Sequence, residues 1–260
     1  MIVASWNVNS ISVRLPQVLD WITANEPDIL CLQETKVVDE RFPKAEFEEL
    51  GYQLAVYGEK TYNGVAIASK LPLANVQKGF KVEVGPGSRR LIAADAGPLR
   101  ILNVYIPNGS AVGSDKYYYK LAWLSALKNH IDESYRRDDL LIMCGDFNIA
   151  CEDRDIYNPE EVAGTIMCSD VERKALNAVK DWGLIDVFRE HHQDSGLYTW
   201  WDYRMGAFRR NVGFRIDHIW ASRPLAPLCK AILIDREPRK LERPSDHAPV
   251  FAEFDVTIAS

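Results

Sequence analysis

A carboxylate and a carboxamide stand two residues apart at the end of a predicted buried strand. The apolar run 140–143 leads into Gly145, Asp146, Phe147 and Asn148, and a continuous apolar run of this kind is typical of a strand buried on both faces. In an extended chain, side chains two residues apart point to the same side. Asp146 and Asn148 can then orient a water molecule and a phosphate together. An Asx turn that closes the strand is the structural alternative.

Other apolar strands of this chain also end in polar side chains. Each case has a local explanation, such as a turn-forming asparagine or a half-buried core tyrosine. Side chains at the same ends of packed strands converge on one place, however, and we therefore expect them to form one site. The segments are Trp6-Asn7, Leu32-Gln33-Glu34, Val104-Tyr105, Ile216-Asp217 and Ser245-Asp246-His247.

The side chains at these strand ends restrict the chemistry of such a site. Glu, Asp and Asn supply hard oxygen ligands, which suit Mg²⁺ or Mn²⁺ together with phosphate oxygens. The sequence contains no HExxH zinc motif, no GxxxxGK[ST] phosphate loop and no serine or cysteine in a nucleophile elbow. We therefore expect water to be the nucleophile and the reaction to be metal-assisted hydrolysis of a phosphoester. A histidine beside carboxylates can stay protonated and stabilise the transition state.

The pattern of strands with intervening helices predicts one α/β domain of packed layers over residues 1–260. A capping box, Ser169 to Glu172, starts one of the helices. Residues 151–168 lack a clear period and are expected to form a long, functional loop. The other expected helices lie over residues 15–22 and 121–131, and the expected strands over residues 2–8, 28–32, 52–56, 64–68, 90–95, 100–106, 140–143, 214–220 and 250–256.

Composition and charge set broad limits on location and partners. Five cysteines without a CxxC spacing indicate a reducing compartment and no disulfide framework. The first residues lack the basic and apolar regions of a signal peptide, and no stretch approaches membrane-spanning length. These observations predict a cytoplasmic protein that does not bind membranes. A net charge of −6 argues only weakly against nucleic acid, because a carboxylate cluster that holds a metal biases the count.

The short motifs at the strand ends resemble those of the exonuclease III / AP endonuclease family of DNA repair enzymes, within the endonuclease/exonuclease/phosphatase superfamily. The resemblance runs from Ile2 to Phe254 and implies a four-layer α/β sandwich of the DNase I-like kind, in which two mixed β-sheets pack together and are flanked by helices. The motifs are Trp6-Asn7-Val8-Asn9, Leu32-Gln33-Glu34-Thr35-Lys36, Asn103-Val104-Tyr105, Gly145-Asp146-Phe147-Asn148, Arg215-Ile216-Asp217 and Pro244-Ser245-Asp246-His247-Ala248-Pro249.

The resemblance implies a magnesium site, which Mn²⁺ can also occupy. Glu34 would be the principal ligand, with Asn7 and Asp246 nearby through water. The wider set of residues that the resemblance places at the metal adds Asp146, Asn148 and His247.

Roles in the reaction are implied in the same way. Asp146 would orient or deprotonate the attacking water, although a phenolate at Tyr105 is the alternative base. Asn148 and Tyr105 would hold the phosphate from two sides. His247 would contact a non-bridging phosphate oxygen, and Asp217 would accept its other ring hydrogen, which keeps the imidazole oriented.

The expected partner is double-stranded DNA with abasic sites, nicks or blocked 3′ ends, bound by a monomer. Trp200, Phe214 and Ile216 match positions that line an apolar pocket for an extruded deoxyribose without its base. Arg204 is expected to insert into the duplex, and Arg209 to contact its backbone. The remaining predicted DNA-binding residues are Asn9, Asn108 and Met167.

Two departures from the family pattern bear on the dominant activity. Met167 stands where abasic-site endonucleases usually carry a small residue, and Ala111 stands where some members carry a DNA-inserting arginine. Our hypothesis is therefore a Mg²⁺-dependent 3′-5′ exonuclease and 3′-phosphodiesterase, with abasic-site incision as a weaker activity. The alternatives are an enzyme that is mainly an AP endonuclease, a phosphatase on a non-DNA substrate, and a DNA-binding protein that has lost catalysis.

Overall fold

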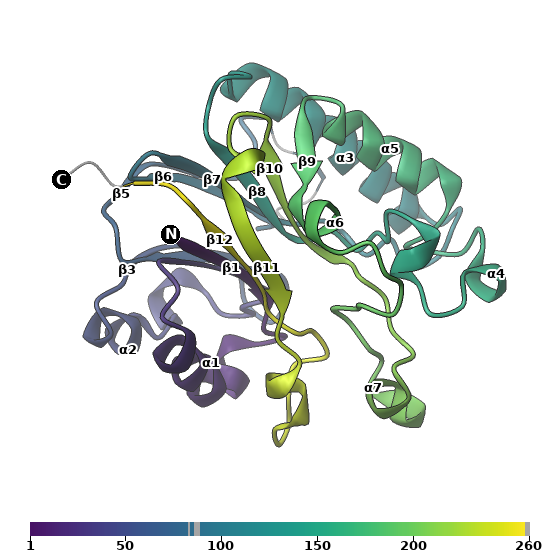
Figure 1. Ribbon diagram of the computed structural model, residues 1–260, viewed down its shortest axis with the longest axis horizontal. Coiled ribbons are helices and arrows are strands. Elements are labelled where there is room, and N and C mark those ends of the chain that lie inside the picture. Colours follow the sequence, from purple (N-terminus) through teal and green to yellow (C-terminus); the bar gives the residue numbers. More distant parts are fainter. Residues whose placement is uncertain (83, 86–88, 258–260) are drawn as a thin grey trace.

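Two six-stranded β-sheets pack against each other in the computed structural model, which describes residues 1–82, 84–85 and 89–257 (Figure 1). Each sheet is mixed, with one parallel pair, β1 with β2 and β7 with β8, among antiparallel neighbours. The first sheet has the order β11 (Cys229–Ile234), β12 (Val250–Phe254), β1 (Ile2–Asn7), β2 (Ile29–Gln33), β4 (Val65–Ser69), β3 (Gln53–Tyr57). The second has the order β5 (Leu73–Lys78), β6 (Leu91–Ala96), β7 (Leu99–Tyr105), β8 (Leu141–Asp146), β10 (Asp217–Ser222), β9 (Leu184–Asp186).

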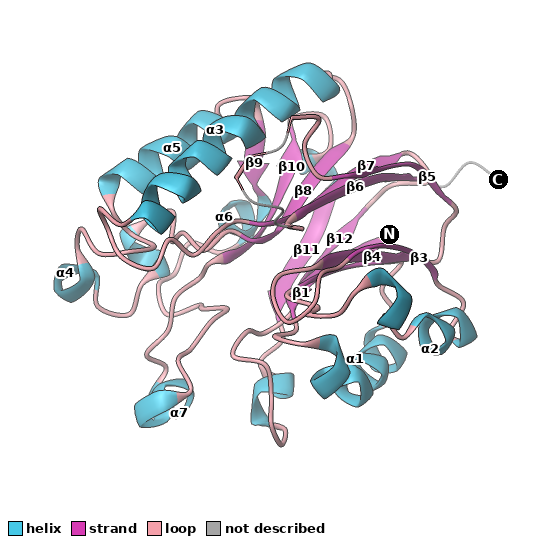
Figure 2. Cartoon of the chain, turned by 180° about the vertical axis from the view of Figure 1, so that it is seen from behind, coloured by secondary structure: helices cyan, strands magenta, loops and turns pink. Residues whose placement is uncertain are grey.

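Helices cover the outer face of each sheet (Figure 2). The first sheet is covered by α1 (Ile11–Asn25) and α2 (Lys44–Glu49), and the second by α3 (Asp115–Ser134) and α5 (Asp170–Lys180). The shorter helices are α4 (Pro159–Val162), α6 (Val187–His191) and α7 (Ala207–Arg210). The single-turn 3-10 helices are η1 (Asp39–Arg41), η2 (Asp153–Asp155), η3 (Arg204–Gly206), η4 (Ala226–Leu228) and η5 (Glu237–Lys240).

Three apolar cores separate the layers. The inner one, which includes Val3 from β1 and Ile101 from β7, lies between the two sheets. The other two lie between a sheet and its helices and include Leu124 of α3 and Val18 of α1. Helix, sheet, sheet and helix thus form the four-layer α/β sandwich that was expected, and the DNase I-like fold class is confirmed.

Residues 151–168 differ from the long loop that the sequence suggested. They contain η2 and α4, and Glu152 caps the first of these turns through a capping box with Asp155. The capping box at Ser169 and Glu172 is present, and α5 begins at Asp170 as expected. No helix among the described residues is both long and apolar enough to cross a membrane.

Candidate active site

The register between strands brings the polar strand ends into one row. Asp146, the last residue of β8, is the Cα partner of Tyr105 on one side and of Asp217 on the other. Asn7 ends β1 in the opposite sheet, and its Nδ2 donates a hydrogen bond to Oδ2 of Asp146 at 2.9 Å. The candidate site therefore lies where the ends of the two sheets meet, and Asp146 is at its centre.

Asp146 and Asn148 form an Asx turn and also share the site. The backbone N–H of Asn148 donates to Oδ1 of Asp146 at 2.9 Å, and Nδ2 of Asn148 donates to Oδ2 at 3.1 Å. Asn148 has a φ of 51°, so the chain is not extended there. The structural alternative, an Asx turn that closes the strand, is therefore present, and this turn itself holds the two side chains together.

The same turn recurs at two other strand ends that face the site. Oδ1 of Asn7 accepts the N–H of Asn9 at 3.0 Å, and Oδ1 of Asn108 accepts the N–H of Ser110 at 3.1 Å. Glu34 also has a positive φ, 53°, directly after β2. Such conformations cost free energy and persist where the surrounding structure imposes them, which is common at functional sites.

A buried histidine lies between two carboxylates. Nδ1 of His247 is 2.8 Å from Oδ2 of Asp217, and its Nε2 is 3.8 Å from Oδ2 of Asp146. Burial by itself would lower the pKa of His247, but the negative charges of Asp217 and Asp146 outweigh burial and raise the pKa to about 10. The imidazole is therefore a cation at neutral pH, with Nε2 directed toward Asp146.

The two candidate bases have different proton affinities. Burial, together with the charge of Asp217, raises the pKa of Asp146 to about 7, against the opposing effect of His247. Burial and the neighbouring Glu34 raise the pKa of Tyr105 well above its ordinary value, and Oη of Tyr105 donates to Oε1 of Glu34 at 2.7 Å. At neutral pH the carboxylate can accept a proton, whereas the phenol keeps its own.

The oxygen donors near Asp146 fit a hard divalent cation. Asp146, Asp217 and His247 lie close enough to share a metal ion, but a protonated imidazole cannot be a ligand. Glu34 and Asp246 supply the remaining carboxylates. Burial opposes ionisation of Asp246, yet His247 and the hydrogen bonds from Trp200 and Asn9 lower its pKa. An ionised carboxylate at this position matches the oxygen ligands that Mg²⁺ prefers.

The predicted sugar-binding residues form one apolar cluster beside the site. Ile216 is 1% exposed, and Met167, Trp200 and Phe214 pack against the same cluster. The rings of Trp200 and Phe214 meet edge to face, with centroids 5.8 Å apart. Met167 has a φ of 72°, so the backbone before α5 turns sharply at this residue.

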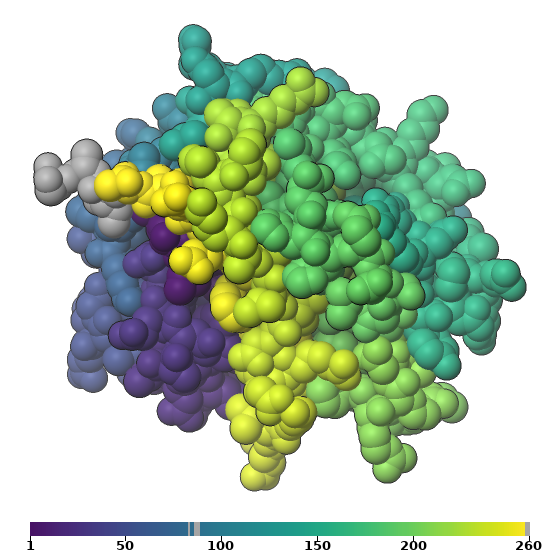
Figure 3. All heavy atoms as spheres, viewed as in Figure 1, coloured from purple at the N-terminus to yellow at the C-terminus, as the bar shows by residue number. Residues whose placement is uncertain are grey.

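The other predicted DNA-binding residues divide into two groups. Asn9 and Asn108 lie at the site, where Nδ2 of Asn9 donates to Oδ1 of Asp246 and Nδ2 of Asn108 donates to Oδ1 of Asn148. Arg204 and Arg209 are exposed on η3 and α7. Figure 3 shows this segment in green and residues 236–245 in yellow as two separate projections from the lower edge of the molecule.

Met205 was not singled out from the sequence. It lies between Arg204 and Gly206 on the same projection, its side chain is 84% exposed and its φ is 55°. An apolar side chain held out from a basic loop is typical of wedges that enter between DNA base steps. The available signal was a lone methionine next to an arginine and a glycine in an aromatic and arginine-rich stretch.

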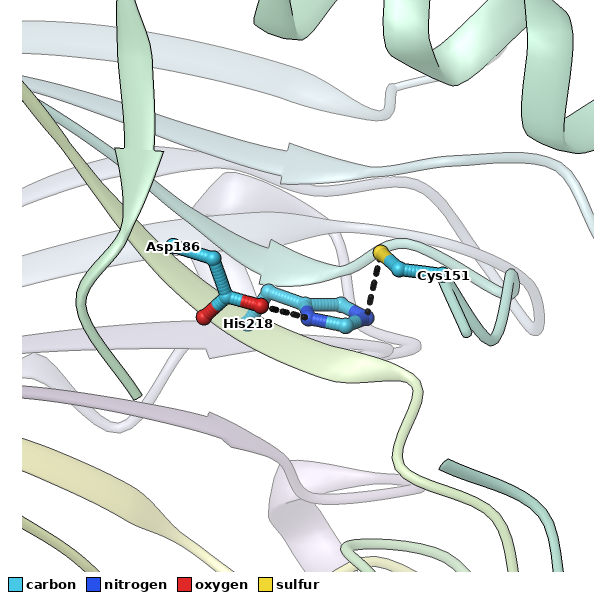
Figure 4. A group of neighbouring side chains, drawn as sticks. All are labelled: Cys151, Asp186 and His218. Carbon is cyan, nitrogen blue, oxygen red and sulfur yellow. Dashed lines mark hydrogen bonds and ion pairs between the residues drawn. The ribbon is translucent and has the colours of Figure 1, made fainter. Parts of the chain in front are cut away.

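A second cluster of residues that could bind a metal is instead a structural hydrogen-bond network. Cys151, Asp186 and His218 lie together (Figure 4). The guanidinium of Arg215 donates to both oxygens of Asp186 and faces Nδ1 of His218 at 3.0 Å. Nε2 of His218 therefore carries the proton and donates to the carbonyl of Ile149 at 3.0 Å. Burial, then Arg215, lowers the pKa of His218 to about 4, so this histidine is neutral and fully hydrogen-bonded.

Comparisons with known proteins identify the family. The model of the Endonuclease/Exonuclease/phosphatase family matches residues 4–247. Exodeoxyribonuclease III of Haemophilus influenzae is 34% identical over 262 residues, covering 96% of this chain and 98% of that protein. Two solved structures are similar over nearly the whole chain. That of the 3′ phosphatase NExo from Neisseria, bound to product DNA hairpin, has 44% sequence identity and a TM-score of 0.96. That of an AP endonuclease from Archaeoglobus fulgidus has 40% identity and a TM-score of 0.95, and each alignment covers 98% of this chain and 100% of the other.

Proposed function

The chain belongs to the endonuclease/exonuclease/phosphatase family, among the exonuclease III and AP endonuclease enzymes, and from this premise we propose that it hydrolyses DNA at 3′ ends with the help of Mg²⁺. It is a DNA repair nuclease, a hydrolase that acts on DNA phosphodiester bonds. The proposal adds the metal, the preferred position on the DNA and the residue roles. We propose that a monomer acts on nicked duplexes and on duplexes with blocked 3′ ends.

The single observation that carries the proposal is the set of charges around Asp146. A carboxylate with a pKa near 7 lies 3.8 Å from Nε2 of the His247 cation, and Asn7 and Asn148 donate hydrogen bonds to it. This arrangement can take a proton from water on one side and present positive charge to a phosphate on the other.

Each residue then has a defined task in hydrolysis. Glu34, with Asp246 nearby, would hold a metal ion, which supplies positive charge to a phosphate oxygen when bound. Asp146 accepts the proton of the attacking water. His247 donates a hydrogen bond to a non-bridging oxygen, and Asp217 keeps its ring oriented. Asn148 and Tyr105 donate hydrogen bonds to the phosphate, which positions the phosphorus for attack.

The preference for 3′ ends rests on two residues beside the site. Met167 packs against the same apolar cluster as Trp200, Phe214 and Ile216. In our proposal its side chain narrows the space for an extruded abasic sugar. Ala111 has no long side chain that could fill the gap which an extruded nucleotide leaves in an internal duplex. A terminal nucleotide at a nick can enter the site without being extruded from a continuous strand. The relative from Neisseria, a 3′ phosphatase, supports this preference.

A direct competition between substrates tests the proposal. Duplexes of one sequence would carry a nick, a nick with a 3′-phosphate, or an internal abasic site, and single-turnover rates would be measured with Mg²⁺ and after its removal by a chelator. We expect the nicked duplexes to be cleaved at least about tenfold faster than the internal site, and no cleavage after chelation. Faster cleavage at the internal abasic site would establish an AP endonuclease instead, and full activity after chelation would exclude the metal.

A further inference from the structure

A lysine is completely buried directly behind the candidate active site. Lys120 belongs to α3, and its side chain has 0% exposure, as does that of Glu172 on α5, with which it forms an ion pair. Lysine is among the residues least often buried in this way. None of the roles assigned above to catalysis or DNA binding uses this pair.

The ammonium of Lys120 joins two loops that carry predicted phosphate and DNA contacts. Its Nζ donates to the backbone carbonyl of Asn148 at 2.8 Å and to that of Asn108 at 3.1 Å. The side chains of the same two asparagines are themselves hydrogen-bonded at 3.0 Å. The two loops are thus tied together twice, once at the surface of the site and once behind it.

Glu172 extends the connection to a third loop. Its Oε1 accepts both Lys120 and the backbone N–H of Met167, the latter at 3.1 Å. Its Oε2 accepts the N–H and the hydroxyl of Ser169, which completes the capping box of α5. The three donors of one ammonium and the two oxygens of one carboxylate therefore link the loops around Asn108, Asn148 and Met167.

Stability alone does not explain a charged pair at this position. Apolar residues of similar volume often replace a buried ion pair with no loss of stability, because both charges must be removed from water. A glutamine also serves in a capping box, so the cap does not require a lysine beneath it. The packing is close, since a Cβ on Gly109 would come within 3.1 Å of Cδ of Lys120 and 2.8 Å of Cδ1 of Ile166.

We propose that Lys120 and Glu172 are positioning residues for the nuclease reaction, which hold the loops of Asn108, Asn148 and Met167 in the relative arrangement that the transition state requires. The inference rests on the proposed function, because it assigns meaning to the alignment of substrate-binding loops. Small displacements of positioned groups lower the rate of a chemical step much more than they lower stability. The pair therefore acts on kcat through the asparagines, without contacting DNA.

The test separates positioning from stability with a neutral version of the pair. Lys120→Met combined with Glu172→Gln removes both charges and leaves one side-chain oxygen, which can accept either the N–H of Met167 or that of Ser169. Thermal unfolding would be measured alongside kcat and KM on a nicked duplex. We expect a lower Tm, because the carbonyls of Asn108 and Asn148 lose their donor, but a variant that is still folded at the assay temperature. Its KM should be little changed and its kcat lowered at least about tenfold. Lys128→Met, on the exposed side of α3, serves as the matched control and should leave Tm, KM and kcat unchanged.

A folded double variant with kcat within about twofold of the wild type would overturn the inference, as would a loss that only follows the fraction unfolded. Should the double variant not fold, Glu172→Asp decides, because it keeps both charges but withdraws the carboxylate from Lys120 and Met167; wild-type kcat in that variant would also overturn the inference. An inactive wild type would refute the proposed function and this inference with it, whereas an active wild type beside an equally active double variant refutes the inference alone.

Discussion

At the scale of single residues, the site depends on the contrast between Asp146 and His247. Burial raises the pKa of Asp146 to about 7, while neighbouring carboxylates raise that of His247 to about 10. Between these values the carboxylate can accept a proton and the imidazole still carries its positive charge. A base and an electrostatic partner in the same site therefore act in one pH range.

The pH profile of kcat/KM on a nicked duplex should follow from these two groups. Activity needs Asp146 deprotonated, so it should rise through about pH 7, and it needs His247 protonated, so it should fall again through about pH 10. Control substrates with different leaving groups should give the same limbs. A flat profile between pH 5 and pH 9, on the order of no more than a twofold change, would contradict the assignment.

Replacing Asp217 should move both limbs of that profile in one direction. Its negative charge raises the pKa of His247 and that of Asp146, so Asp217→Asn should shift both limbs to lower pH and reduce kcat by about 10²-fold through loss of the oriented ring. Asp132→Asn, which changes an aspartate on the surface of α3, is the control. An unmoved alkaline limb would show that Asp217 does not act on the histidine.

The residues of the site were more predictable than their local geometry. Glu34, Asp146, Asp217 and His247 could be proposed because polar side chains directly follow apolar strands, and the structure brings these residues together. The left-handed conformations of Glu34 and Asn148 were not predicted from the sequence. They accompany hydrogen bonds to residues far away in the sequence, from Tyr105 to Glu34 and from Asn108 to Asn148. Lys120 was not singled out from the sequence either, because its burial depends on the loops of Asn108 and Asn148 and on Glu172.

At the scale of elements, two buried amides fix the sheets relative to each other. Asn103 on β7 donates to the carbonyls of Leu32 and Ala66 in the opposite sheet, and its Oδ1 accepts Nε2 of Gln33 at 2.8 Å. Gln33 also donates to Oγ of Ser5. These contacts lie one or two residues from Glu34 and Tyr105, so they set the distance between the two halves of the site.

Asn103→Ala should destabilise the fold by about 3 kcal/mol, because it leaves buried carbonyls and the amide of Gln33 without partners. Urea unfolding would measure the change in the free energy of unfolding. The control is Asn158→Ala, an exposed asparagine directly before α4 that donates to Glu161, for which about 0.5 kcal/mol or less is expected. Equal losses for the two variants would contradict the role of Asn103.

The projection that carries η3 and α7 is expected to act in binding. Met205→Ala should raise KM on a nicked duplex several-fold with kcat nearly unchanged. The exposed side chain lies away from the catalytic residues at the strand ends and would act as a wedge between DNA bases. Val171→Ala, which removes an exposed apolar side chain on α5, is the matched control. A fall in kcat at constant KM would assign Met205 to the chemical step instead.

Some elements left no clear pattern in the sequence. β5 is an edge strand with most of its side chains exposed, and it pairs with β6 across a register shift between Ala74 and Gln77. β9 spans only Leu184–Asp186. Apolar periodicity requires a longer element with one buried face, and strands such as β1 and β8 meet that condition.

At the scale of the whole molecule, net charge is a poor guide to the partner. The chain carries −6, yet Asp146 and Asp217 are buried within the site, and Asp246 beside them is half-buried. Exposed arginines gather on the projection with α7. A DNA backbone senses this local distribution and not the total.

The four-layer architecture followed from the resemblance and from the layered pattern of strands and helices. The order of strands within each sheet did not, because β1 and β12 pair across nearly the full length of the chain. Such long-range pairing is decided by the packing of the whole core. It also explains how Asn7 and His247, far apart in sequence, come to lie beside Asp146.

The most direct test of the account is single-turnover cleavage of a nicked duplex by Asp146→Asn, with DNA binding measured in parallel. The variant keeps the shape of the side chain and the Asx turn but cannot accept a proton. We predict a rate lowered at least about 10³-fold with binding changed less than about threefold, while Asp132→Asn on the surface of α3 behaves as the wild type. Cleavage by Asp146→Asn at the wild-type rate, or a loss of activity that only mirrors a loss of binding, would contradict the central role of this carboxylate.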